Sequence, residues 1–343
     1  MPAPHTPSPA RPERLDEIDA VKALGILVVV LIHTVRSPWE PGASHFELWL
    51  GHATRFAVPG FLAASGYLYA AGATNAAGGA RASVPFEATR RRLVRIALPY
   101  LVFSLAAQAV RHARGMGPAT GSVASDLLLA HSFGPYYYVL VAAAMVVATP
   151  ALARLSTRGH VAAFAAAFAV QGWLEIYSRL DFTWHLRNPL LWLAYFELGW
   201  LARIARDAGA LPSGARAAAA ALAFAAAAAG ALASLWSMPP QPLARAIEWL
   251  AVYGVLAAAF LAARARAGAA RRGVRALSDA TYSIYLSHLL FLPWLRDAFA
   301  APPGVVAPSA IALPWLGALL ASLALVALGR AALGSRSRVW LGA

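Results

Sequence analysis

The sequence predicts an all-α fold, a polytopic membrane helical bundle with about ten transmembrane helices, and three observations support this fold class. First, 60% of the residues are hydrophobic and only 13% are charged, which is unusual for a soluble domain with one buried core. Second, the hydrophobic residues gather into long runs separated by Gly, Pro and Arg. Third, the basic residues are scattered between these runs, as in membrane proteins with a fixed orientation.

Each hydrophobic run is long enough to cross a hydrocarbon core of about 30 Å as a helix. The first run contains a lysine and a histidine, the second a Pro-Gly pair, the third follows an arginine cluster, and the seventh is mostly alanine. In order, the predicted spans are 18–36, 47–72, 92–112, 135–155, 161–177, 189–206, 215–236, 243–264, 279–299 and 309–332. The alanine-rich run is expected to pack inside the bundle through its small side chains.

The segments outside these spans complete the predicted organisation. Residues 1–17 are rich in proline and are predicted to form a disordered cytoplasmic tail. Residues 18–332 form one membrane domain, and residues 333–343 are expected to be a short cytoplasmic tail. Most arginines fall at cytoplasmic ends if the N-terminus is inside, which predicts an even number of spans and places both termini in the cytoplasm.

Composition also limits the function classes. The net charge is +14, but the basic residues are scattered between apolar runs, which indicates membrane topology. We therefore expect membrane lipid as a partner and no nucleic acid. The chain has no cysteine, which excludes disulfides and thiolate chemistry. None of the polar residues within the spans has metal-ligand spacing such as HxxxH, so no metal site is expected.

The first span, IDAVKALGILVVVLIHTVR, carries the clearest functional signal. Lys22 and His33 are eleven residues apart, about three helical turns, so both lie on one face and about 16 Å apart along the axis. Asp19 precedes Lys22 by three residues and shares this face. A polar stripe in lipid costs several kcal/mol unless it has partners, which favours a functional role. The alternative is that His33 only hydrogen-bonds a neighbouring helix.

The second and third spans hold further candidate residues. Pro59-Gly60 is expected to kink or loosen its helix. Ser65-Gly66-Tyr67 follows, where small residues allow close approach of either a helix or a ligand, and spacing alone leaves both open. Arg92 and Arg95 lie three residues apart at the mouth of the third span, where such a pair can hold a phosphate or simply anchor the helix.

The ninth span, LSDATYSIYLSHLLFL, places polar groups within the membrane. Ser278 and Asp279 resemble a helix N-cap. Tyr282, Tyr285 and His288 recur every third residue and line one face, and for the tyrosines an interhelical hydrogen-bond ladder is the favoured interpretation.

These motifs together resemble the integral-membrane acyltransferase-3 family, which includes bacterial O-acetylases of glycans. Lys22 with ten residues before His33 is similar to the family's R/K-x10-H motif, and Arg92-Leu-Val-Arg95 to its RxxR motif. The remaining blocks that are similar are VPGFLAASGYL, FGPYYYVLVAAAMVVATP, FELGWLAR and LSDATYSIYLSHLLFL. The similarity covers nearly the whole spanning region.

The resemblance implies a reaction and a site. It implies that an acyl group, usually acetyl, passes from acyl-coenzyme A to a hydroxyl of a carbohydrate or small-molecule acceptor, with acyl-CoA as co-substrate and no bound cofactor. The implied location is the bacterial cytoplasmic (inner) membrane. His33 would be the general base, with Asp19 positioning Lys22, or would carry the acyl group itself. Lys22, Ser65, Gly66, Arg92 and Arg95 would bind the donor, with Tyr67, Tyr282, Tyr285 and His288 as possible additional residues.

Two other function classes compete with this one. A proton-coupled transporter or flippase also uses intramembrane His and Glu, but it would predict internal repeats, which the sequence does not show. A purely structural assembly partner has no use for the polar stripe of the first span.

Overall fold

The computed structural model describes residues 15–36, 44–77, 84–178, 180–210, 242–265, 272–300, 302 and 307–342. Throughout these ranges every regular element is helical, so the predicted all-α class is confirmed. The α-helices are α1 (Asp16–Ile32), α2 (His45–Ala53), α3 (Ala57–Ala77), α4 (Phe86–Ala113), α5 (Val123–Leu128), α6 (Tyr137–Leu152), α7 (Thr157–Tyr177), α8 (Phe182–Arg187), α9 (Leu193–Asp207), α11 (Pro242–Ala265), α12 (Arg272–Ala298), α13 (Pro308–Leu333) and α14 (Ser337–Trp340). Short 3-10 turns are η1 (Gly134–Tyr136), η2 (Pro189–Leu191) and η3 (Gly334–Arg336). The alanine-rich run 215–236 lies outside the described residues.

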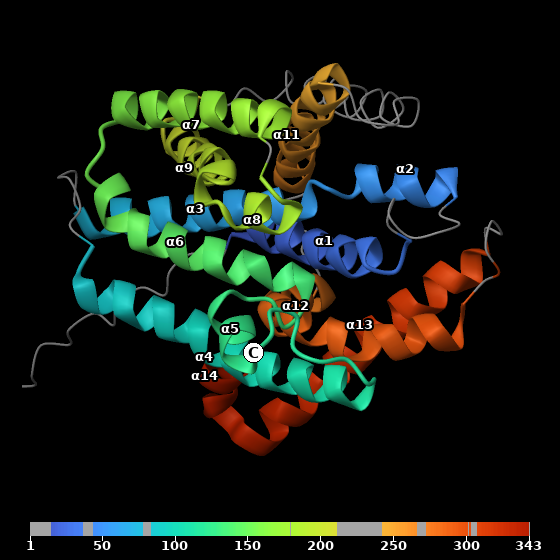
Figure 1. The fold of residues 1–343 in the computed structure, drawn as a ribbon. Coiled ribbons are helices and arrows are strands. Elements are labelled where there is room, and N and C mark those ends of the chain that lie inside the picture. Colours follow the sequence, from blue (N-terminus) through green and yellow to red (C-terminus); the bar gives the residue numbers. More distant parts are fainter. Residues whose placement is uncertain are drawn as a thin grey trace, which may run out of the picture.

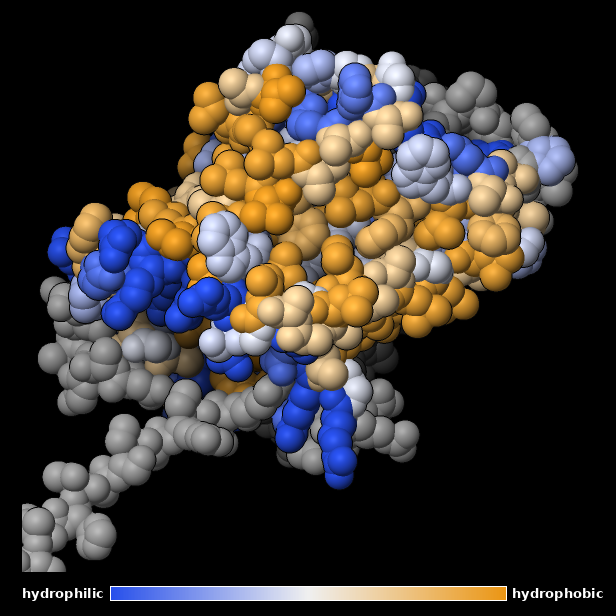
Figure 2. Space-filling view, turned by 90° about the horizontal axis from the view of Figure 1, so that it is seen from below, coloured by the Kyte–Doolittle hydropathy of each residue, from blue (hydrophilic) through white to orange (hydrophobic). Residues whose placement is uncertain are grey.

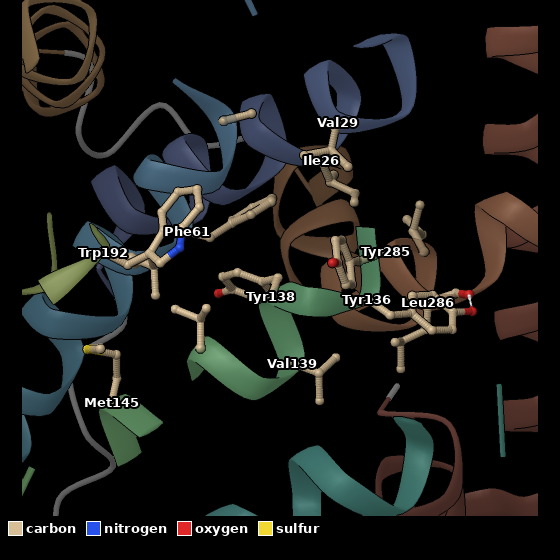
Figure 3. Packing of buried hydrophobic residues seen from close by; sticks show 14 of the residues in the cluster. Ile26, Val29, Phe61, Tyr136, Tyr138, Val139, Met145, Trp192, Tyr285 and Leu286 are labelled. Atoms are coloured by element: carbon tan, nitrogen blue, oxygen red, sulfur yellow. Dashed lines mark hydrogen bonds between the residues drawn. The ribbon is translucent and has the colours of Figure 1, made fainter. Parts of the chain in front are cut away.

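Helix α1 lies in the middle of the bundle (Figure 1). It packs against α3 and α11 on one side and against α12 and α13 on another. Its buried residues Ile26, Val29 and Val30 belong to the main hydrophobic core, together with aromatic residues of α6 and α12. Figure 3 shows Ile26 and Val29 near Tyr285, so the helix that carries the polar stripe packs its apolar residues into the main core.

Small residues bring α3 and α9 into backbone contact. A Cβ on Gly199 would overlap the carbonyl oxygen of Ala63, and a Cβ on Gly66 would overlap the carbonyl oxygen of Phe196. Two helices can approach this closely only where no side chain stands between them. The glycines of the ASGYL and FELGW blocks therefore form one helix crossing, which fixes α3 beside α9.

The surface has the apolar character of a membrane protein. Figure 2 shows a broad hydrophobic face with hydrophilic residues gathered at its edges. Leu105, Leu320 and Leu328 are large side chains that α4 and α13 expose, which lipid would cover. Four helical stretches among the described residues are long and apolar enough to cross a membrane: Phe46–Ala73, Phe86–Ala113, Gly134–Leu152 and Pro308–Trp340. The larger predicted count of about ten is not established by these four.

Some helix boundaries differ from those predicted. α1 begins at Asp16, so the predicted tail ends before residue 17. The run 47–72 is broken by a turn at residues 54–56, and Pro59 lies in the first turn of α3, where proline is tolerated, so the break precedes the expected kink. The N-cap interpretation of Ser278-Asp279 is wrong, because α12 begins at Arg272 and Ser278 donates its hydroxyl to another helix instead.

Candidate active site

A cavity of about 450 Å³ opens between α1, α3, α4, α6 and α12, and we call it the central cavity. This volume falls within the usual range of ligand pockets. The lining includes five residues that the sequence predicted as donor-binding or additional site residues: Lys22, Ser65, Arg92, Tyr282 and Tyr285. The rest of the lining is mostly apolar or aromatic and includes Phe61, Leu62, Leu68, Tyr69, Ile96, Tyr138, Ala142, Met145, Val146 and Phe196.

The cationic part of the cavity is formed by Lys22 and Arg92. The Arg92 guanidinium carbon lies 4.2 Å from the ring centroid of Tyr69, a cation–π contact that holds the side chain on the cavity wall. Its predicted companion Arg95 is exposed and does not line the cavity. Two more arginines of the cluster, Arg90 and Arg91, lie outside it and face Glu87. Of the four clustered arginines, only Arg92 reaches the cavity.

The acidic residues beside Lys22 tie α1 to α12. Ser278 Oγ donates to Asp19 Oδ1 at 2.6 Å, and both side chains are buried. Arg275 pairs with Asp16 at 3.0 Å one turn earlier. Ser278 and the adjacent Asp279 also line the cavity. Asp19 therefore holds the turn of α1 that carries Lys22 against α12. The sequence did not predict Ser278 as the partner of Asp19.

His33 lies at the opposite end of α1, where it is the C-cap residue. Its imidazole stacks on that of His288 in α12, with ring centroids 5.4 Å apart and planes 27° from parallel. His288 is fully buried, and its Nδ1 lies 3.0 Å from the carbonyl oxygen of Ile284. Neither histidine lines the central cavity, but Tyr285 does. The ring centroids of Tyr285 and His288 lie 6.2 Å apart. The histidine pair thus lies behind Tyr285, next to the cavity.

The predicted tyrosine ladder is confirmed. The Tyr282 hydroxyl donates to the carbonyl oxygen of Ile96 at 2.7 Å, which joins α12 to α4. The Tyr285 hydroxyl donates to the carbonyl oxygen of Pro135, and its ring meets Tyr138 edge-on. Figure 3 shows Tyr138 between Phe61 and Tyr285. These aromatic residues connect the cavity to the histidine pair.

Two predicted residues have structural partners elsewhere. The Tyr67 hydroxyl donates to the buried Glu17 and accepts from Arg206, so it belongs to a network that ties α3 to α1 and α9. Gly66 faces α9, as described above, and Ser65 Oγ donates to the carbonyl oxygen of Phe61 while lining the cavity. A donor-binding role for Gly66 stays a prediction.

The residues after α13 contribute a wall that the sequence did not predict. Ser283 Oγ donates to the carbonyl oxygen of Leu341 at 2.8 Å, and Gly342 lines the cavity. Gly342 has φ +73, and a Cβ there would lie 2.7 Å from Cδ1 of Tyr282. Only glycine fits this close approach in a left-handed conformation. No sequence pattern indicated this contact, because it joins segments far apart in the chain.

Comparison with known proteins gives one match. A family model described as an acyltransferase domain, that of acyltransferase-3 proteins, matches residues 15–330. The curated proteins and the solved structures gave no match. The matched range contains α1, three of the four membrane-length stretches, most of α13 in the fourth, and every predicted site residue. The resemblance of the sequence motifs is therefore confirmed, and the chain belongs to the acyltransferase-3 family of membrane proteins.

Proposed function

We propose that the protein transfers an acyl group, with acetyl the expected one, from acyl-coenzyme A to a hydroxyl of a glycan or another cell-envelope acceptor. The observation that carries this proposal is the placement of two cations, Lys22 and Arg92, on a mostly apolar cavity. One lining residue of this cavity, Tyr285, contacts His288, which stacks on His33. Coenzyme A has matching chemistry, because charged phosphates are followed by a long uncharged arm and a thioester.

The cavity suits the donor in size and polarity. Its aromatic and aliphatic lining would hold the pantetheine arm, and Lys22 and Arg92 would hold the phosphates. Along α1 the helical rise separates Lys22 from His33 by about 16 Å, a distance that an extended arm can cross. Arg95, which is exposed on the same helix as Arg92, would contribute only long-range attraction to the nucleotide.

His33 would act as the general base. It takes the proton from the acceptor hydroxyl while that oxygen attacks the thioester carbonyl carbon. The carbon–sulfur bond then breaks, and the leaving sulfur takes the proton that His33 held, so that coenzyme A is released as the thiol. In the second version of this mechanism, His33 attacks the thioester carbonyl carbon and the coenzyme A thiolate leaves. The acceptor hydroxyl then attacks the acyl-imidazole, which frees His33, and the hydroxyl proton passes to the thiolate.

The proposed membrane arrangement follows from the arginine distribution. Both ends of the chain lie in the cytoplasm, the protein lies in a bacterial inner membrane, and about ten segments cross it. Reporter fusions placed after Ala343 and in the linker between Arg264 and Arg275 should both report the cytoplasm. An external signal at either position would contradict the even span number.

Release of coenzyme A by the purified protein tests the proposed reaction. Because the chain contains no cysteine, a thiol reagent detects only the released coenzyme A. We expect detergent-purified protein to release thiol from acetyl-CoA, and His33→Ala to reduce the rate by about 10²–10⁴-fold without loss of folded protein. Near-normal release by His33→Ala would show that the base assignment is wrong.

A further inference from the structure

His288 has an unsatisfied nitrogen at the proposed reaction centre. Its Nδ1 lies 3.0 Å from the carbonyl oxygen of Ile284, which can only accept, so Nδ1 carries the hydrogen. In the neutral ring Nε2 then has a free lone pair. This atom is buried and has no hydrogen-bond partner among the described residues. Burying a charged ring instead would be far more costly.

An unpartnered buried acceptor destabilises the fold by about 1–3 kcal/mol, so its presence calls for an explanation. Several other buried polar residues of α12 have hydrogen-bond partners: Ser278 bonds Asp19, Ser283 bonds Leu341, and Tyr285 bonds Pro135. The Ser287 hydroxyl, next to His288, also lacks a partner among the described residues. His288 also stacks on His33, the proposed base. The unpaired nitrogen therefore lies where an incoming substrate would meet the base.

The acceptor is the substrate that would meet Nε2. The donor cavity includes Tyr285 but not His288, so the histidine pair lies beyond the residues proposed to hold the arm. A hydroxyl gives its single hydrogen to one partner only. If His33 removes the proton of the reacting hydroxyl, the lone pair of His288 is left for a different O–H group.

We propose that His288 binds a second hydroxyl of the acceptor, adjacent to the one that is acylated, so that the acceptor is a vicinal diol such as a sugar ring presents. Two stacked imidazoles with centroids 5.4 Å apart offer two nitrogens to neighbouring hydroxyls of one molecule. One hydroxyl loses its proton to His33, and the other donates to His288 Nε2 and orients the ring. This inference rests on the proposed function and adds a residue that binds the acceptor and a requirement for two neighbouring hydroxyls.

Simple alcohols of similar size test this proposal with purified protein and acetyl-CoA. The probes are 1,2-cyclohexanediol and cyclohexanol, and the product is the acetate ester. We expect the wild type to prefer the diol by about tenfold in kcat/KM, the effect of one hydrogen bond. His288→Phe keeps a stacking ring without a lone pair and should abolish this preference while leaving the KM for acetyl-CoA unchanged. His112→Phe, at an exposed histidine of α4, is the matched control.

Two conservative variants separate hydrogen bonding from packing. Gln places an amide oxygen about as far out as Nε2, whereas Asn reaches only the position of Nδ1. His288→Gln should therefore recover part of the diol preference, and His288→Asn should not. The proposal is overturned if the wild type makes no ester from either alcohol, if it accepts both equally, or if His288→Phe keeps the preference. If His33→Ala loses thiol release while His288→Phe keeps the diol preference of the wild type, this inference is overturned and the proposed function stands.

Discussion

Replacement of Arg92 tests whether the central cavity binds the donor. The Arg92 side chain is half-buried on the cavity wall and stacked on Tyr69, so a phosphate there would be partly shielded from water. A charge-assisted hydrogen bond in such a place contributes about 1.5–3 kcal/mol, and Arg92→Ala should weaken coenzyme A binding about 10- to 150-fold. Arg92→Lys keeps the charge but loses the planar fork and the stack, so it should recover only part of the affinity.

Arg95 and Arg91 give matched comparisons, because both are exposed arginines of the same helix. An exposed charge contributes about 0.2–1 kcal/mol, so Arg95→Ala should weaken binding at most about fivefold, and Arg91→Ala should change it little. Calorimetric titration of coenzyme A into the variants in detergent measures all affinities, and binding should weaken as salt rises. Equal affinities of wild type, Arg92→Lys and Arg92→Ala would remove Arg92 from the donor site.

Three further predictions concern stability. Gly199→Ala forces a methyl group against the Ala63 carbonyl oxygen, so thermal unfolding in detergent should occur at a clearly lower temperature; an unchanged midpoint would contradict the close crossing. Ser278→Ala removes the donor to Asp19 and should destabilise the protein by about 1.5–3 kcal/mol, whereas Ser278→Thr, which keeps a hydroxyl, should destabilise it less in the same melt. Burial raises the pKa of Asp126, but hydrogen bonds from Thr120, Ala119 and Gln108 outweigh burial and hold this pKa below its ordinary value of 3.8. The ionised Asp126 carboxylate should therefore stabilise the folded protein above pH 3.8, and this contribution should be lost as the pH falls through the lower pKa of the folded state. Limited proteolysis of the α4–α6 connection should show this acid sensitivity in the wild type and not in Asp126→Asn.

Continuous apolar runs made the helices predictable, but not their ends. The run at 309–332 matches α13 to within one residue at each end, and the run at 92–112 lies inside α4, which begins six residues earlier at Phe86. Lipid requires a helix wherever the chain is apolar for that length. The start of α12 was misplaced, since Ser278 has the composition of a cap but bonds Asp19 of another helix. Tertiary contacts of this kind leave no periodic signal in the sequence.

The site residues, like the helices, were predictable from the sequence only where they belong to a local pattern. The family resemblance grouped Lys22 and Arg92 as donor-binding residues, and the structure brings them to one cavity. The spacing of the RxxR motif could not separate Arg92 from Arg95, because the two differ in the direction of their side chains around α4. Tyr69 and Tyr138 line the cavity without belonging to any motif of charged or catalytic residues, so only the packing of α3 and α6 reveals them.

The wall at Gly342 has a consequence for the divergence of this pocket. Of the described residues after α13, Gly342 is the one that lines the cavity, so substitutions at exposed positions of this segment, such as Arg336 and Arg338, should not change the shape of the pocket. Gly342 itself is constrained by its left-handed backbone and by the Tyr282 ring. A mutation there would narrow or displace the wall in one step, which offers directed evolution a single position for altering donor size.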